Sequence, residues 1–108
     1  MAYLTALPFA DLPVDTQAVA TVAGMQILLI NDRGTIHALE NRCSHADSPL
    51  DCGRVRLGWI ACPAHGARFD LATGEALTGP ASEPVRVFAV RVTDGTIEVD
   101  AQAIAGGI

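Results

Sequence analysis

Three short turn signals divide much of the chain into segments typical of β-strands. Ala23-Gly24 lies between "QAVATV" and "MQILLI", and "NDRG" at residues 31–34 lies between "MQILLI" and "TIHALE". Asp94-Gly95 joins "VRVFAVRV" to "TIEVD". A glycine-containing turn between two runs of aliphatic and β-branched residues favours a hairpin, because glycine adopts the positive φ that a tight turn needs. With no segment suited to a long helix, the pattern predicts an all-β domain.

The last of these segments shows the alternation of a half-buried strand. Ile97 and Val99 point to one face, and Thr96, Glu98 and Asp100 point to the other. Side chains of a strand alternate with a period of two, so we expect Ile97 and Val99 to face the core.

Length and composition are those of one globular domain. The chain has 108 residues, of which half are hydrophobic and 18% are charged. A chain of this size can build a single core, and its composition is unlike that of a disordered protein. The formal net charge of −5 argues against nucleic acid and anionic lipid as partners.

No segment reads as a membrane anchor or a secretion signal. The longest apolar stretch, residues 18–30, is too short to span a bilayer and is interrupted by Gly24 and Gln26. The first ten residues lack the basic start of a signal peptide. Three cysteines is an odd number, which fits a secreted disulfide framework poorly, so we expect a cytoplasmic protein.

Residues 43–84 differ in composition from the flanking segments. Glycines and prolines punctuate this stretch, and only two short strands fit, around Gly58–Ala61 and Ala67–Leu71. The rest is predicted to be loop. Long ordered loops inside a small domain are usually functional.

The same stretch contains a regular set of metal-binding side chains. Cys43-x-His45 is followed, after sixteen residues, by Cys62-x-x-His65, so each half offers one thiolate and one imidazole. Such ligands suit zinc, copper and iron–sulfur clusters. A structural zinc site also takes two cysteines and two histidines, but it usually pairs like with like, whereas here each half mixes the two types.

The spacing C-x-H followed by C-x-x-H resembles the Rieske iron–sulfur family. "CPAHGARFD" is very close to the second cluster loop of that family, and "ENRCSH", "GWIACPAHG" and "LATGEAL" also look like a soluble Rieske ferredoxin. The resemblance implies a Rieske-type antiparallel β-sandwich or barrel with a small cluster-binding subdomain of two ligand loops. It also implies one [2Fe-2S] cluster per chain, with Cys43 and Cys62 on one iron and His45 and His65 on the other.

The resemblance covers nearly the whole chain, which is then a single Rieske domain spanning residues 1–108. The cluster-binding subdomain is expected at approximately 42–81, inserted in a β framework formed by 1–41 and 82–101. Residues 102–108 are expected to form a tail.

Two departures from the high-potential members of the family concern the redox potential. Those members carry serine and tyrosine hydroxyls in the second loop, where this chain has Ala67 and Phe69. They also join the two loops by a disulfide, for which this chain has Ser48 and Ala64. Without hydroxyl donors to the cluster sulfurs, we expect a potential near the low end of the Rieske range, roughly −150 mV.

The resemblance further implies an electron carrier rather than an enzyme. The chain looks like the ferredoxin component of bacterial aromatic-ring-hydroxylating dioxygenase systems. Such a carrier takes electrons from a flavin-containing ferredoxin reductase and gives them to a terminal Rieske oxygenase; we expect a monomer that binds neither nucleic acid nor membrane. Two alternatives remain open, the small Rieske-like subunit of an assimilatory nitrite reductase and a zinc-stabilised interaction module.

Four further side chains have simple structural interpretations. Cys52 is expected to be a small, semi-buried filler in the first loop, and His37 a surface residue of a strand. Trp59 is expected to pack in the core beneath the loops. Asp70 is a candidate for a local ion pair with Arg68.

Overall fold

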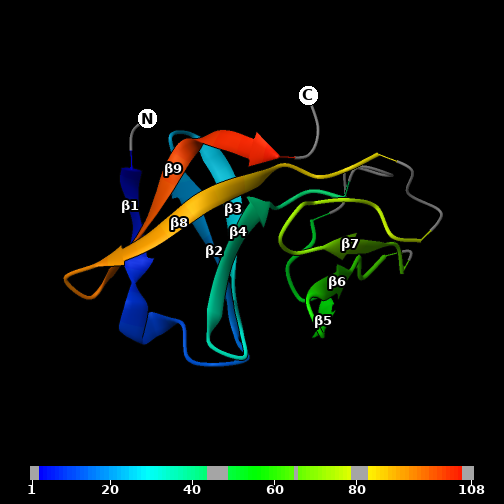
Figure 1. Ribbon diagram of the computed structural model, residues 1–108, viewed down its shortest axis with the longest axis horizontal. Coiled ribbons are helices and arrows are strands. Elements are labelled where there is room, and N and C mark those ends of the chain that lie inside the picture. Colours follow the sequence, from blue (N-terminus) through cyan, green and yellow to red (C-terminus); the bar gives the residue numbers. More distant parts are fainter. Residues whose placement is uncertain (1–2, 44–48, 65, 79–82, 106–108) are drawn as a thin grey trace.

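The computed structural model describes residues 3–43, 49–64, 66–78 and 83–105, with the backbone alone for 103–105. Two antiparallel sheets make up this part of the chain (Figure 1). The elements are β1 (Tyr3–Pro8), the single-turn 3-10 helix η1 (Phe9–Asp11), β2 (Gln17–Val22), β3 (Met25–Asp32), β4 (Thr35–Glu40), β5 (Arg54–Arg56), β6 (Trp59–Ala61), β7 (Arg68–Asp70), β8 (Val87–Thr93) and β9 (Thr96–Ala105). The prediction of an all-β domain is confirmed. Within the described ranges, no helix has the length and apolar character needed to span a membrane.

The larger sheet has six strands and curls toward a closed barrel. Its strand order is β1-β9-β8-β4-β3-β2, and the edge strands β1 and β2 lie next to each other. Curling a sheet on itself protects its edges and encloses one face as a core. We call this six-stranded sheet the framework.

The three expected hairpins of the framework are confirmed, each with a two-residue turn. Ala23 and Gly24 have φ values of 51° and 78°, and positive φ values also occur at the pairs Arg33-Gly34 and Asp94-Gly95. Two successive positive φ values define the turn whose twist matches that of the flanking strands. The local sequence therefore fixes the register of β2 with β3, β3 with β4, and β8 with β9.

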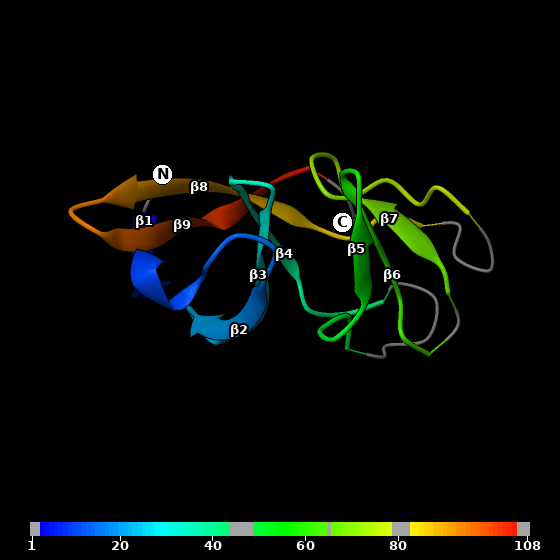
Figure 2. The same ribbon diagram turned by 90° about the horizontal axis from the view of Figure 1, so that it is seen from below.

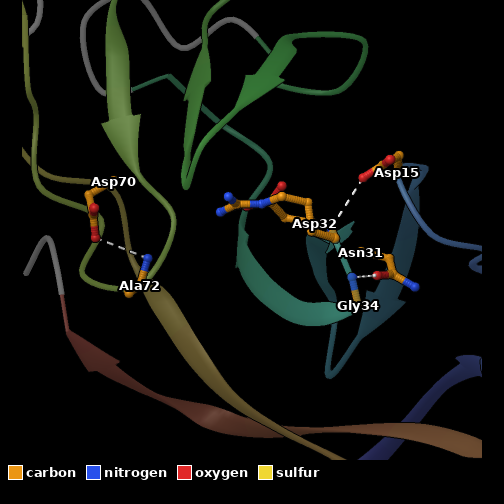
Figure 3. A network of polar contacts seen from close by, with 7 residues as sticks. Asp15, Asn31, Asp32, Gly34, Asp70 and Ala72 are labelled. Carbon is orange, nitrogen blue, oxygen red and sulfur yellow. Dashed lines mark hydrogen bonds and ion pairs between the residues drawn. The ribbon is translucent and has the colours of Figure 1, made fainter.

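A buried asparagine secures the second of these turns (Figure 3). The Asn31 Oδ1 accepts a hydrogen bond from the Gly34 amide at 2.9 Å, and its Nδ2 donates to the Leu12 carbonyl at 2.9 Å. The Arg33 amide donates to Oδ1 of Asp15 at 3.1 Å. All the polar atoms of the Asn31 side chain are thus used, as a buried amide requires.

β3 is buried on both faces, which explains its uninterrupted apolar sequence. Ile27 and Leu29 pack inside the framework, in a core that also contains Ile97. Leu28 and Ile30 point the other way, into a second core shared with the smaller sheet. We call the first the barrel core and the second the cluster-side core. Burying each of these side chains contributes about 2 kcal/mol to stability.

The chain ends differently from the prediction. β9 continues through Ala105 because β8 offers it a partner as far as the pair Val87–Ala105. The tail predicted from residue 102 is therefore wrong up to residue 105, and 106–108 lie outside the described residues. Ile97 and Val99 are buried as predicted, but Asp100 is also buried, and its Oδ1 accepts a hydrogen bond from the Gln102 amide at 3.0 Å.

Candidate functional site: two loops on the smaller sheet

The smaller sheet, β5-β6-β7, lies beside the framework and packs on it with one face (Figures 1 and 2). Val55, Ile60 and Phe69 form a row across this sheet and contribute to the cluster-side core. All three strands fall within the segment expected to bind the cluster. β6 and β7 match the two short strands predicted there, whereas β5 was not predicted. The extent of the cluster-binding subdomain stays a prediction.

The two predicted sulfur ligands lie in the same core. Cys43 follows β4 and is fully buried, and Cys62 follows β6 with 2% of its surface exposed. All three cysteines belong to the described residues, and none of them forms a disulfide. The two predicted imidazole ligands, His45 and His65, lie outside the described residues, so they stay predictions.

Asn41 closes the first loop at its base. The Oδ1 of Asn41 accepts hydrogen bonds from the amides of Leu50 and Asp51, both at 2.9 Å, and its Nδ2 donates to Oδ1 of Asp51 at 3.0 Å. The Asn41 amide itself donates to the Gln26 carbonyl of the framework at 3.0 Å. One side chain therefore ties the chain entering the loop, two residues before Cys43, to the chain leaving it.

The second loop is a tight extension of the β6–β7 hairpin. The Cys62 amide donates to the Ala67 carbonyl at 2.7 Å, and the Gly66 amide donates to the Cys62 carbonyl at 2.8 Å. Gly66 has a φ of 75°, which suits glycine. The hairpin thus fixes the backbone on both sides of the Cys62 thiol.

A glycine lets the two loops meet. A Cβ atom on Gly53 would overlap the carbonyl oxygen of Ala61 and lie 2.8 Å from that of Leu50. Only glycine allows the end of the first loop to lie directly against β6, one residue before Cys62. Gln17 of the framework holds this contact from outside, because its Oε1 accepts from the Cys52 amide and its Nε2 donates to the Gly53 carbonyl, both at 2.9 Å.

The surroundings of the two cysteines suit a metal centre of low charge. Ala67 and Phe69 are fully buried in the same core, and neither side chain has a hydroxyl group. Bare thiolates are unfavourable in such an apolar environment, but thiolates bound to iron are neutralised by it. Two buried cysteines on adjoining loops therefore fit the sulfur half of a mixed cysteine and histidine set. Among the described residues alone, no three metal-binding side chains come together, as expected when two of the four are outside them.

His37 lies apart from the cysteines, halfway along β4, and is half-buried rather than a surface residue. Burial lowers the pKa of His37 below its usual value of 6.5. The carboxylates of Asp32 and Asp70 and a hydrogen bond with the Leu71 backbone oppose this shift without cancelling it.

Three minor expectations are wrong. Cys52 is exposed, with a φ of 70°. Trp59 lies on the outer face of the smaller sheet, where the Arg68 guanidinium stacks 4.3 Å from its ring centre. Asp70 does not pair with Arg68: its Oδ2 instead accepts from the amides of the turn that follows, including that of Ala72 at 3.0 Å (Figure 3).

Comparison with known proteins identifies the family. A profile of the Rieske [2Fe-2S] domain matches residues 3–89. The chain belongs to the Rieske family. It holds a [2Fe-2S] cluster, which excludes the zinc-stabilised module.

Relatives of this Rieske chain include ferredoxins of similar length. It is 35% identical to the 3-phenylpropionate/cinnamic acid dioxygenase ferredoxin subunit of Escherichia coli, over 88% of this chain and 90% of that one. The ferredoxin of carbazole 1,9a-dioxygenase from Nocardioides aromaticivorans superposes with a TM-score of 0.88 at 29% identity, covering 94% of this chain and all of the other. A ferredoxin solved in complex with the oxygenase of carbazole 1,9a-dioxygenase superposes with a TM-score of 0.83 at 25% identity, covering 98% and 96%.

Proposed function

We propose that this Rieske protein is a one-electron carrier that serves a terminal Rieske oxygenase of an aromatic dioxygenase system. The observation that carries the proposal is the placement of Cys43 and Cys62, buried together on two adjoining loops of a ferredoxin-like fold. The relatives reported above are ferredoxin components of dioxygenase systems, which favours this function over that of a nitrite reductase subunit. A carrier of this kind catalyses no bond chemistry of its own.

In this proposal, Cys43 and Cys62 hold one iron and His45 and His65 hold the other. The cluster, when bound, supplies reversible uptake of a single electron. The chain buries the sulfur ligands in apolar surroundings and fixes their backbone through Asn41 and the β6–β7 hairpin. A fixed backbone at the sulfur ligands helps electron transfer, because it limits the reorganisation that accompanies each change of charge.

The apolar residues beside the cysteines set the proposed potential. An oxidised cluster with two thiolates and neutral imidazoles has no net charge, so reduction places one negative charge in the site. Hydroxyl donors would stabilise that charge, but Ala67 and Phe69 supply none. We therefore propose a potential near the low end of the Rieske range, roughly −150 mV.

A flavin-containing ferredoxin reductase is the proposed electron donor, and the terminal oxygenase the acceptor. An oxygenase is the better supported of the two, because a structural relative was solved in complex with one. The chain is further proposed to act as a cytoplasmic monomer. Its net charge of −5 supports a carrier that avoids nucleic acid and anionic membranes.

Reconstitution with a purified flavin-containing ferredoxin reductase and a purified terminal Rieske oxygenase tests the proposal. Stopped-flow absorbance should show the reductase delivering one electron per chain, and the oxygenase then reoxidising the reduced protein. Product formation should fall at least about tenfold when the chain is omitted. A reduced protein that the oxygenase leaves reduced would refute the proposal.

A further inference from the structure

The outer face of the smaller sheet gathers positive charge. Antiparallel pairing places Arg54, Ala61 and Arg68 in one row, and Arg56, Trp59 and Asp70 in the next. These side chains point away from the cluster-side core, and all three arginines are exposed. We call this surface the arginine face.

These charges are not neutralised within the described part of the chain. Ion pairs with a neighbouring carboxylate occupy Arg33, Arg42 and Arg91, whereas none is found there for the three arginines of the arginine face. Among the described residues, Asp70 is the carboxylate in these two rows. It accepts hydrogen bonds from the Ala72 amide, seen in Figure 3, and from the Thr73 amide, which direct it into its own turn. Within the described residues, a protein of net charge −5 thus has a basic surface without paired carboxylates on its smaller sheet.

The arginine face also offers groups that commonly anchor an interface. The Arg68 guanidinium lies 4.3 Å from the centre of the partly exposed Trp59 ring, an arrangement that pre-orders both side chains. Leu57, in the turn beside this face, is 77% exposed. Tryptophan and arginine dominate the binding energy of many interfaces, particularly with an apolar contact beside them.

The face adjoins the proposed redox centre. Ala61, in the row between Arg54 and Arg68, directly precedes Cys62. A protein docked on this row therefore lies against the second ligand loop. Arg54 and Arg68 flank the small Ala61 side chain, which leaves space between them for a side chain of the partner. Electrostatic attraction at such a position raises the rate of productive encounter and orients the partner.

We propose that the arginine face docks an acidic surface patch of the terminal oxygenase. This inference rests on the proposed function, which makes the oxygenase the electron acceptor. The positive charge of the face favours an acidic partner surface. Because Cys62 lies next to this face, a partner docked there is close to the proposed cluster, as electron transfer requires.

Neutralising the row next to Cys62 tests the docking proposal. Isothermal titration calorimetry should measure binding of the holoprotein to the terminal Rieske oxygenase that it reduces in the reconstituted system, for the parent and for the double variant Arg54→Gln, Arg68→Gln. The double variant should bind about tenfold more weakly than the parent at low salt. The difference between the two dissociation constants should disappear at high salt, where surface charges are screened. Arg56→Gln, which leaves the Trp59 stack intact, should weaken binding by a smaller factor in the same direction.

Arg91→Gln is the matched control for Arg56→Gln, because each removes one positive charge. Arg91 lies in the framework, where it pairs with Glu98 at 2.6 Å. Arg91→Gln should leave the dissociation constant within about twofold of the parent. The proposal is overturned if the double variant binds the oxygenase as tightly as the parent does. It is also overturned if Arg91→Gln weakens this binding as much as the arginine-face variants do, or if those variants weaken binding to the reductase but not to the oxygenase.

Failure of docking is distinguishable from failure of the proposed function. If the parent protein reduces the oxygenase but the arginine variants bind it as tightly, only the docking proposal is wrong. If the parent protein does not reduce the oxygenase, the proposed function itself fails. Visible spectra of the variants confirm that each retains its cluster.

Discussion

The framework and the smaller sheet are stabilised in different ways. The framework has strands of six to ten residues, hairpins with tight turns, and a barrel core of its own. The smaller sheet has strands of three residues and depends on the cluster-side core and on a few bonds to the framework. Stability therefore comes mainly from the framework, while the geometry of the cluster loops depends on contacts made by Asn41, Gln17 and Gly53.

Of the substitutions considered, Gly53→Ala in the first ligand loop should have the largest effect on stability and iron content compared with a matched substitution in the framework. In Gly53→Ala the new methyl group meets two backbone carbonyls, which cannot move without separating the first loop from β6. We expect a loss of about 3 kcal/mol in unfolding free energy and less than half of the parent iron content, measured by thermal unfolding and iron analysis.

Gly24→Ala is the matched control in the framework. Gly24 has a φ of 78° with open space around it, so the substitution costs only backbone strain of about 1 kcal/mol. Iron content should stay at the parent level. Equal iron loss in both variants would show that the loop contact at Gly53 has no special role.

Two asparagines allow the same comparison with one type of substitution. Asn41→Ala leaves the Leu50 and Asp51 amides without their acceptor, at a cost of about 2 kcal/mol, and should release the base of the first loop. Asn31→Ala removes a similar set of bonds from the framework. We expect both variants to melt at lower temperature, but only Asn41→Ala to bleach faster under a chelator. Matching bleaching rates would contradict the account.

A smaller effect is expected from a single hydroxyl group beside the cysteines. Ala67→Ser should raise the midpoint potential, because a hydroxyl donor stabilises the reduced site. One hydrogen bond of about 1 kcal/mol corresponds to roughly 40 mV for a single electron. Ala38→Ser, at a buried alanine of the barrel core, should leave the potential unchanged. If protein-film voltammetry finds a lower midpoint potential for Ala67→Ser than for the parent, residue 67 does not lie where its side chain can donate to the cluster sulfurs.

The smallest effect concerns His37. Its folded-state pKa is lowered by burial, so the unfolded chain takes up a proton first as the pH falls below 6.5. The contribution of His37 to stability is therefore present above pH 6.5 and is lost on acidification. The melting temperature of the parent should exceed that of His37→Gln by more at pH 7.5 than at pH 5.5. A gap that widens toward pH 5.5 would contradict the burial of the neutral ring.

The framework could be predicted from the sequence wherever a turn signal stood between two apolar runs. The hairpin around Arg33-Gly34 is such a case, because Gly34 between two apolar runs indicates a tight turn, and the structure has positive φ values at both residues. β1 lacks a turn signal of its own and is defined only by pairing with β9, which is distant in sequence. The end of β9 escaped prediction for the same reason, since β8 rather than alternation extends it to Ala105.

The candidate site also has a part that the sequence predicts and a part that only the structure reveals. Residue spacing was enough to predict four cluster ligands, because the chemistry requires particular side chains at particular positions. The structure places two of them, Cys43 and Cys62, in one buried core, and His45 and His65 stay predictions. The sequence did not reveal Asn41, Gln17 or Gly53 as the residues that hold the loops. The partners of Asn41 and Gln17 lie 9 to 36 positions away in the chain, and Gly53 meets the Ala61 carbonyl across the fold. A glycine or asparagine in a loop looks the same whether or not it makes such a contact.

The ligand set of the cluster is the central claim, and the nitrogen couplings of the reduced protein test it most directly. The chain has three histidines, so His37→Gln protein labelled with ¹⁵N-histidine carries label only at positions 45 and 65. Pulsed electron paramagnetic resonance of the dithionite-reduced sample should detect two ¹⁵N nuclei coupled to the cluster, and only one after the further change His45→Ala if the cluster survives. A parent spectrum without histidine nitrogen coupling would contradict the account.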